Sequence, residues 1–300
     1  MKALVTGATG LVGRGLVPRL PGVHVLSRDP QRAASTLGTE TRAFAWNTNS
    51  PAPTEAFEDR DIVFHLAGEP IAAKRWTPAQ KQRIRASRCE GTRHLVETML
   101  ALDRPPATLV SASGIGIYGD RADEALDESS EPGDGFLADI CRGWEREAMR
   151  AATAGIRVVC MRIGIVLSPR GGALERMLPP FRLGLGGPMG DGRHYMSWID
   201  LDDLIGLLLH VAEHDVAGPV NAVAPNPVTN RDFARTLAHV LSRPAWLAAP
   251  RWALRMALGE LSDAVLTSQR VAPTVALASG YSFTRPHLET ALRHCVERPG

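Results

Sequence analysis

The sequence predicts an α/β protein in which a doubly wound parallel sheet carries a smaller C-terminal lobe. Short runs rich in β-branched residues alternate with longer helical stretches over the first half of the 300-residue chain. A glycine-rich turn separates the first predicted strand from the first predicted helix. Hydrophobic residues make up 44% of the chain, which is enough for a packed core.

The predicted elements of the first half follow in regular order. Strands are expected at residues 3–6, 23–27, 43–46, 62–66, 108–111 and 156–162, and helices at 11–20, 30–37, 78–102 and 134–154. Pro30 suits a first helical turn, Thr77 caps the helix that follows it, and Gly155 ends the last one. This alternation indicates βαβ units.

The second half is richer in loops. Glycines gather between residues 171 and 192, around a helix expected at 174–182. Further helices are expected from Asp202 onward, at 230–241 and at 253–266, with a strand at 220–224. We therefore predict a nucleotide-binding domain at 1–170, to which 195–224 returns. A substrate lobe is predicted at 171–194 and 225–300, with ligand in the crevice between the two.

Composition excludes several classes of protein. The formal net charge of +2 gives no electrostatic signature for nucleic acid or an anionic membrane. Four widely spaced cysteines without a C-x-x-C pair fit neither a disulfide framework nor a zinc site, and no metal site is expected. No signal-peptide segment and no membrane-length apolar run is present. We expect a cytoplasmic protein whose partner is a small-molecule substrate, with no nucleic-acid or membrane partner.

The glycine pattern indicates a dinucleotide site. Gly7 permits a tight turn, Gly10 lets backbone N–H groups approach a pyrophosphate, and Gly13 allows the helix to pack closely on the strand. The helix N-terminus adds partial positive charge. The sequence thus predicts a Rossmann-like domain whose cofactor contacts come from Gly7, Thr9, Gly10, Leu11, Val12 and Gly13.

Residues after the second strand distinguish binding of NADP from binding of NAD. Ser27 and Arg28 stand where an acidic residue would bind the ribose 2′-hydroxyl of NAD. A guanidinium suits a 2′-phosphate, so NADP is favoured, although Asp29 keeps NAD as the less favoured alternative. Small residues at later strand ends are expected to pass close to the cofactor: Leu66, Ala67, Gly68 and Ser111.

The motifs together resemble a known superfamily. The T-G-x-x-G-x-x-G at 6–13, H-L-A-G at 65–68, S-A-S-G-I-G-I-Y-G at 111–119 and W-I-D-L-D-D at 198–203 resemble the extended short-chain dehydrogenase/reductases. A-G-E-P-I at 67–71, F-L-A-D-I-C at 136–141 and N-A-V-A-P-N-P-V-T at 221–229 are similar to a divergent epimerase-family branch, described as predicted nucleoside-diphosphate-sugar epimerases. G-Y-S-F at 280–283 looks like that branch's own C-terminal segment.

The resemblance implies a catalytic group that this chain lacks. The superfamily uses a Ser or Thr, a Tyr, and a Lys four residues after the Tyr, which lowers the tyrosine pKa. The three tyrosines here are followed at that spacing by Ala122, Ile199 and Arg285. Where the pair should fall, the chain reads Phe136-Leu137 and then Ile140-Cys141. Ser113 is the best serine candidate and Ser111 the second, but one alignment places Gly114 there.

Other side chains are candidates for the missing chemistry. Glu69 directly follows the cofactor-side glycine and is a candidate base if burial raises its pKa; a helix cap or a pair with Arg75 or Lys74 is the plainer interpretation. Tyr118 is a candidate to contact substrate or to pack at the sheet edge. Cys141 is a candidate nucleophile or a core thiol. A substrate-anion clamp is expected from Arg75, Lys81, Arg88 and Arg193.

Two functional hypotheses follow from these features. The retained cofactor site and the glycine-rich substrate loop favour an NADP-dependent epimerase or oxidoreductase with a non-standard acid/base group, acting on a small polar substrate such as a nucleotide-linked one. The missing Tyr and Lys favour a non-catalytic, NADP-responsive binding or regulatory protein. We lean to the enzyme. A homodimer is common in the superfamily and is expected as one arrangement.

Overall fold

A seven-stranded parallel sheet forms the centre of the molecule. The computed structural model describes residues 1–38 and 40–297. The strand order is β11-β7-β5-β4-β1-β2-β3, and every neighbouring pair is parallel. The bounds are β1 (Ala3–Thr6), β2 (His24–Ser27), β3 (Arg42–Ala45), β4 (Ile62–His65), β5 (Thr108–Gly114), β7 (Arg157–Ile163) and β11 (Gly218–Ala222). The chain reverses direction across the sheet between β1 and β4, and this switch point is where ligands bind in such sheets.

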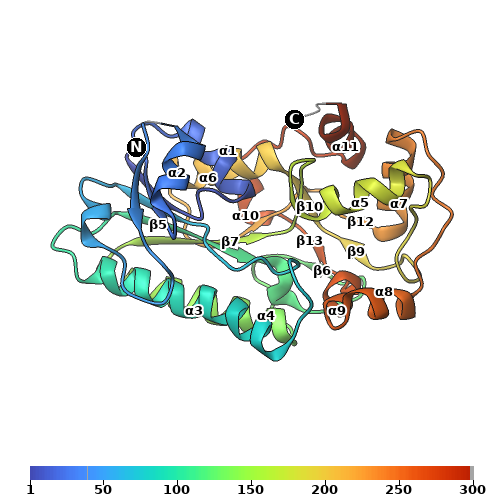
Figure 1. Cartoon of the computed structure of the whole chain (residues 1–300), viewed down its shortest axis with the longest axis horizontal. Coiled ribbons are helices and arrows are strands. Elements are labelled where there is room, and N and C mark those ends of the chain that lie inside the picture. Colours follow the sequence, from blue (N-terminus) through green and yellow to red (C-terminus); the bar gives the residue numbers. More distant parts are fainter. Residues whose placement is uncertain (39, 298–300) are drawn as a thin grey trace.

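Helices cover both faces of the sheet, as Figure 1 shows. One face carries α1 (Leu11–Leu16), α2 (Pro30–Leu37), α6 (Leu201–Glu213) and α10 (Thr274–Ala278), and the other carries α3 (Pro78–Leu100) and α4 (Phe136–Met149). Side chains of one strand alternate between the faces: Ala3 and Val5 join one core cluster, and Leu4 joins the other. Because both faces are buried, the central strands are apolar along their whole length. This explains the runs of β-branched residues from which the strands were predicted.

A second, smaller core lies beside the sheet. Trp198 and Phe233, both fully buried, lie in a cluster to which α5 (Gly172–Arg182), α7 (Asn230–Val240) and α11 (Leu288–Glu297) contribute. Two two-stranded pairings contribute to it, β8 (Ile165–Leu167) with β10 (Trp198–Asp200) and β9 (Tyr195–Met196) with β12 (Val228–Thr229). A third pairing, β6 (Ala125–Leu126) with β13 (Arg270–Val271), packs in a separate cluster. The division into two domains at the predicted boundaries stays a prediction.

Several predicted helices are shorter in the structure. The first α-helix ends at Leu16 and continues as a 3₁₀ turn, Val17–Arg19, because Pro18 has no N–H to donate. The helix predicted at 134–154 likewise ends in a 3₁₀ turn, Arg150–Ala154, before Gly155 adopts the left-handed conformation. A single helix predicted at 253–266 is two helices, α8 (Arg251–Leu258) and α9 (Leu261–Leu266), separated by Gly259 at a φ of 62°.

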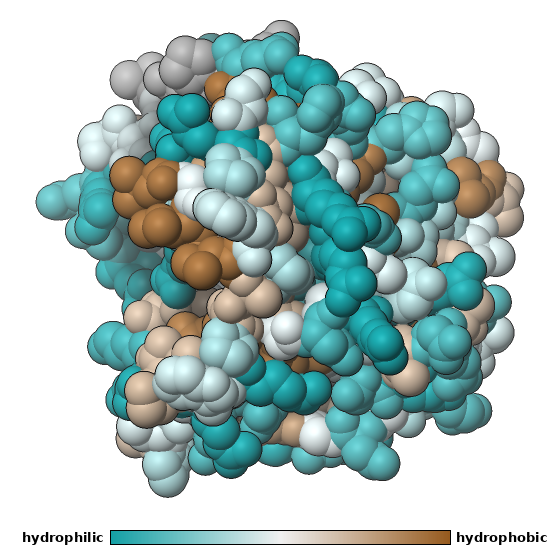
Figure 2. All heavy atoms as spheres, turned by 90° about the vertical axis from the view of Figure 1, so that its right-hand side faces the viewer, coloured by the Kyte–Doolittle hydropathy of each residue, from teal (hydrophilic) through white to brown (hydrophobic). Residues whose placement is uncertain are grey.

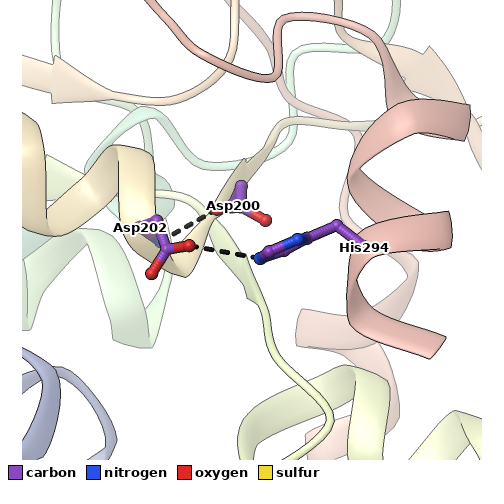
Figure 3. A group of neighbouring side chains, drawn as sticks. All are labelled: Asp200, Asp202 and His294. Carbon is purple, nitrogen blue, oxygen red and sulfur yellow. Dashed lines mark hydrogen bonds and ion pairs between the residues drawn. The ribbon is translucent and has the colours of Figure 1, made fainter. Parts of the chain in front are cut away.

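An ion-pair cluster attaches the last helix to the start of α6. Figure 3 shows Asp200 and Asp202 beside His294 of α11, whose Nε2 lies 3.1 Å from an oxygen of Asp202. Within the described residues, these three side chains are arranged closely enough to hold a metal ion. Arg285 already supplies the positive charge, since its Nη1 lies 3.0 Å from Asp200 and 3.3 Å from Asp202. The cluster therefore joins two parts of the chain by charge pairing.

Large apolar side chains lie uncovered on the outer face of the smaller lobe. This face, turned to the viewer in Figure 2, carries a brown area left of the centre. No residue of α8 is buried, although the helix is amphipathic. The exposed apolar side chains of this region are Leu183, Leu185, Trp246, Leu247, Trp252 and Met256. In the described part of the chain, no helix is both long and apolar enough to cross a membrane.

Candidate functional site

The glycine turn at residues 7–13 is closed so tightly that side chains are excluded from it. Gly7 has a φ of 68°, and a Cβ there would lie 2.6 Å from the Leu66 carbonyl oxygen. A Cβ on Gly13 would lie 2.5 Å from the Gly7 carbonyl oxygen. The Gly10 N–H donates to the Gly7 carbonyl oxygen at 3.0 Å, and this hydrogen bond closes the turn. The predicted reasons for glycine at positions 7 and 13 are thus visible in the packing.

The outer side of this turn fits a negatively charged group. Gly10 is exposed, and the nearest atom to a Cβ there is the Gly7 oxygen at 3.2 Å, with no other heavy atom within 4 Å. The first turn of α1 has no side-chain cap and no acidic residue, so its N–H groups face no competing anion from their own helix. Thr9, Leu11 and Val12 are half-buried around it. These features suit the pyrophosphate of a dinucleotide.

A buried hydrogen-bond chain fixes the loop that faces the turn. Thr6 Oγ1 accepts the N–H groups of Leu66 and Ala67, each at 3.1 Å, and lies 2.8 Å from His65 Nδ1. Because Thr6 Oγ1 already accepts twice, its own proton goes to Nδ1, and His65 Nε2 donates to Thr92 at 2.8 Å. Burial lowers the pKa of His65 to about 3, so the imidazole is neutral at physiological pH. The loop is positioned without adding charge.

Three polar residues at the end of β2, Ser27, Arg28 and Asp29, make different contacts. Asp29 caps α2, since its Oδ1 accepts the Arg32 N–H at 3.0 Å. Ser27 Oγ donates to the Asp29 carbonyl at 3.0 Å. Arg28 is exposed, and no carboxylate of the described residues pairs with it. It lines an open depression at the carboxyl ends of β2 and β3, together with Ala45, Trp46, Asn47, Ser50, Pro51 and Pro53.

The end of β5 carries a buried charged group. Ser113 Oγ donates to Glu145 Oε1 at 2.7 Å. Arg162 of β7 holds both oxygens of Glu145, through Nε at 2.9 Å and Nη2 at 3.0 Å. This bidentate pair holds Glu145 in place, and Glu145 in turn orients the serine. Ser111 is fully buried within the strand and donates to the Ala112 carbonyl at 3.2 Å, so the predicted cofactor contact from its side chain is not supported.

Tyr118 does not reach the crevice, which corrects its predicted role toward substrate. Its side chain is fully buried, and its hydroxyl donates to Asn221 Oδ1 at 2.8 Å and accepts from Arg162 Nη1 at 2.9 Å. Burial raises the pKa of this phenol. A sealed phenol with both bonds made inside the core has no free proton to exchange with a ligand. Its alternative interpretation, packing at the sheet edge, describes the structure.

Glu69 lies half-buried directly after Gly68, at the start of the loop that leads to α3. Its N–H donates to Ser87 at 2.9 Å, and its Oε1 accepts from Gln80 Nε2 at 3.2 Å. No described atom donates to Oε2. Neither Arg75 nor Lys74 pairs with the carboxylate, so the plainer interpretation by ion pairing does not hold. One oxygen of Glu69 is therefore free to accept a proton or a ligand hydroxyl.

The four predicted clamp residues are not brought together. Arg75 donates to backbone carbonyls at the end of α8, including Ala257 at 3.2 Å. Lys81 forms an ion pair with Glu260. Arg193 is exposed in the glycine-rich loop of the smaller lobe. Arg88 alone is buried beside Gly68. The first two residues attach the C-terminal segment to the start of α3 rather than face a ligand.

Comparison with known proteins agrees with this geometry. Residues 3–224 match the NAD dependent epimerase/dehydratase family. The chain belongs to this family. Residues 249–295 match a domain of unknown function (DUF1731), which covers the segment containing α8 to α11. The epimerase/dehydratase family thus accounts for all seven strands of the main sheet.

Individual relatives cover the whole chain. An epimerase family protein of Mycobacterium bovis, Mb2239, is 38% identical over 300 residues, covering 99% of this chain and 98% of its own. The crystal structure of human epimerase family protein SDR39U1 (isoform 2) with NADPH superposes with a TM-score of 0.89 at 33% identity, with full coverage of both chains. The nucleoside-diphosphate sugar epimerase of Corynebacterium glutamicum gives 0.76 at 34% identity, covering 98% of this chain and 57% of that one.

The positions where the wider superfamily has its catalytic group hold other side chains here. Cys141 Sγ lies 3.7 Å from the Cβ position of Gly114, and Leu137 packs against Gly116. Cys141 is buried, and burial raises its pKa to about 11, so the group is a thiol in the core. The hypothesis of a nucleophilic Cys141 is not supported. Among the described residues, the positions beside Gly114 and Gly116 therefore hold Cys141 and Leu137 in place of the superfamily's Tyr and Lys.

Sequence reasoning missed the roles of Glu145 and Arg162. The signal was present, because an arginine at the end of a buried apolar strand requires a charged partner. Glu145 is 14% exposed beside Arg162. The pair links α4 to β7 directly beneath Ser113.

Proposed function

We propose that this protein binds NADP at the switch point of the sheet and acts as an epimerase or oxidoreductase on a small polar substrate, such as a nucleotide-linked sugar. The observation that carries the proposal is the glycine turn. Its inner positions exclude any side chain, while its outer side at Gly10 is open and faces no acid of α1. An open turn of this kind at a helix N-terminus suits a dinucleotide pyrophosphate.

Preference for NADP over NAD is supported by the residues after β2. Asp29 is the residue that made NAD the alternative cofactor, and its carboxylate caps α2 by accepting the Arg32 N–H. Arg28 is left exposed and without a carboxylate partner among the described side chains, at the carboxyl ends of β2 and β3. A free guanidinium at this place complements a 2′-phosphate. The human relative was crystallised with NADPH.

When bound, NADP supplies hydride acceptance and donation, and the chain supplies binding and proton transfer. The backbone N–H groups at the start of α1 bind the phosphates, and Arg28 binds the 2′-phosphate. Glu69 Oε2, which has no donor among the described residues, accepts the proton of a substrate hydroxyl. Ser113, whose own proton goes to Glu145, accepts a hydrogen bond from a substrate hydroxyl. Gln80 fixes the rotamer of Glu69 through Oε1.

A non-catalytic, NADP-responsive role is the competing proposal. It is favoured by Gly114, Leu137 and Cys141, because none of these three exchanges a proton at neutral pH. A protein that only senses NADP needs the glycine turn but has no use for a free carboxylate beside it. The two proposals therefore differ in what they require of Glu69.

A turnover measurement distinguishes the enzyme from the non-catalytic, NADP-responsive protein. Mass spectrometry of the purified protein identifies the bound dinucleotide, and candidate sugar nucleotides are incubated with the NADP-loaded protein. Because an epimerase is hydride-neutral, products are followed by NMR and mass as well as by NADPH absorbance. We expect conversion by the wild type, loss in Glu69→Gln, and no change in Glu131→Gln, an exposed carboxylate outside the site. Conversion that survives in Glu69→Gln refutes the assigned base, and NADP binding without conversion of any candidate supports the sensor.

We also propose a cytoplasmic location and keep a homodimer as a prediction. The location is supported by the four cysteines, all of which are free thiols. Fractionation of cells followed by immunodetection tests the location. Light scattering of the purified protein tests the dimer.

A further inference from the structure

Arg88 is a buried cation that forms no ion pair with the described residues. Its side chain is 8% exposed on α3, and burial lowers its pKa. Nη1 donates to the backbone carbonyls of Glu69 at 2.9 Å and Ile84 at 3.4 Å. No carboxylate of the described residues forms an ion pair with it. Holding a desolvated guanidinium this way is costly unless an anion joins it.

Two donors of Arg88 are free. Nε and Nη2 donate to no atom in the described part of the chain. Among the described residues, three buried side-chain atoms have neither a hydrogen-bond partner nor contact with solvent: Glu128 Oε2, Trp144 Nε1 and His194 Nε2. Nε and Nη2 of Arg88 are not among these atoms, so solvent reaches them. Both donors therefore still reach an accessible space. Nε and one Nη form the edge of a guanidinium that matches two oxygens of one oxyanion.

Three other buried or half-buried arginines of the described residues contact a carboxylate or several backbone carbonyls. Arg162 holds both oxygens of Glu145, and Arg285 pairs with Asp200. Arg157 donates to three backbone carbonyls, those of Val211, Ala212 and Val216, at 2.7 to 2.9 Å. Arg88 differs from Arg162 and Arg285 in having no carboxylate partner, and from Arg157 in donating to carbonyls through a single nitrogen. Its burial is thus not explained by a structural role alone.

Arg88 lies beside the loop that follows β4. Its guanidinium lies over the Trp144 ring, 5.1 Å from the centroid, and 3.1 to 3.3 Å from the Cβ position of Gly68. The indole beneath and the glycine backbone beside the guanidinium leave only its edge for a ligand.

We propose that Arg88 binds a carboxylate of the substrate, so that the substrate class is a small carboxylate-bearing molecule, such as a sugar acid. The inference rests on the proposed function, because it places this carboxylate next to the cofactor. A carboxylate is planar and presents two oxygens, which matches the free Nε and Nη2 edge. It would give Arg88 the carboxylate partner that no ion pair of the described residues supplies.

The test uses oxalate as the carboxylate probe and the full-length protein loaded with NADPH. NADPH affinity is measured first, and calorimetry then gives oxalate affinity for the wild type, Arg88→Lys and Arg85→Lys. Arg85 is an exposed arginine of the same helix and serves as the matched control. The Nε–Hε resonance of Arg88, observed by NMR in the wild type, reports the contact directly. Inorganic phosphate and chloride are titrated in parallel.

We expect oxalate to bind the wild type and Arg85→Lys equally, to shift the Arg88 Nε–Hε resonance, and to bind Arg88→Lys roughly 10- to 100-fold more weakly, as for the loss of a charge-assisted bidentate contact. Should Arg88→Lys not fold, the wild-type resonance decides alone. Equal oxalate affinity in Arg88→Lys, an unmoved resonance, or tighter binding of phosphate than of oxalate would overturn the inference. NADPH binding without oxalate binding overturns it while leaving the cofactor proposal intact. Absence of NADPH binding overturns the cofactor proposal, and oxalate is then titrated into the cofactor-free protein under the same criteria.

Discussion

Arg28→Ala should change the choice of dinucleotide without changing the fold. Arg28 is exposed and has no carboxylate partner among the described residues, so its removal breaks no internal contact. A hydrogen bond to a charged group contributes about 1.5–3 kcal/mol. Because solvent screens an exposed pair, we take a value near the lower end, about 1–1.5 kcal/mol. This corresponds to roughly 5- to 10-fold weaker NADPH binding. NADH, which has no 2′-phosphate, should bind as before.

Fluorescence titration of NADPH and NADH measures both affinities in one preparation. The matched control is Arg104→Ala. Arg104 is an exposed arginine just before β5, near the amino end of that strand and so away from the carboxyl ends where Arg28 lies. The affinity of the wild type for NADPH should also fall more steeply with salt than that of Arg28→Ala. An unchanged NADPH-to-NADH ratio in Arg28→Ala, or an equal loss in Arg104→Ala, would falsify the assignment of Arg28 to the 2′-phosphate.

Three further outcomes follow from the packing. Gly7→Ala should abolish measurable NADPH binding and lower the thermal midpoint, because its Cβ would lie 2.6 Å from the Leu66 oxygen at a φ of 68°; binding at wild-type strength would contradict the tight closure of the turn. Glu145→Met and Arg162→Met should each cost about 3–5 kcal/mol in urea unfolding, and the double variant much less than their sum; additive losses would show that the two charges are independent. The pKa of His65 is lowered to about 3 by burial, so the unfolded chain binds the extra proton between about pH 6.5 and 3 and stability falls as pH falls through that range. From pH 6.5 to 5 the loss should be about 2 kcal/mol, and a His65→Gln variant should show a correspondingly smaller loss; identical pH profiles would refute this.

Local signals determined most of the elements. The helix predicted at 30–37 has the same bounds in the structure, because Asp29 and Pro30 define its first turn within a few residues. Thr77 caps α3 as predicted, by accepting the Gln80 N–H. Boundaries were wrong where a helix loosened into a 3₁₀ turn or broke at Gly259. These ends depend on how the next segment packs, which periodicity does not contain.

The glycine turn, the strand before it and the residues after β2 were readable from the sequence, because each depends on neighbours a few residues away. The candidate acid/base site was not, because its contacts join distant parts of the chain. Tyr118 is withdrawn from the crevice by Asn221, 103 residues later, and Arg75 is occupied by a carbonyl 182 residues later. Sequence alone also gave no sign that Arg162 satisfies Glu145 whereas Arg88 has no such partner. Composition shows how many charges a chain carries, and only the tertiary packing decides which of them are buried together and which is left to bind a ligand.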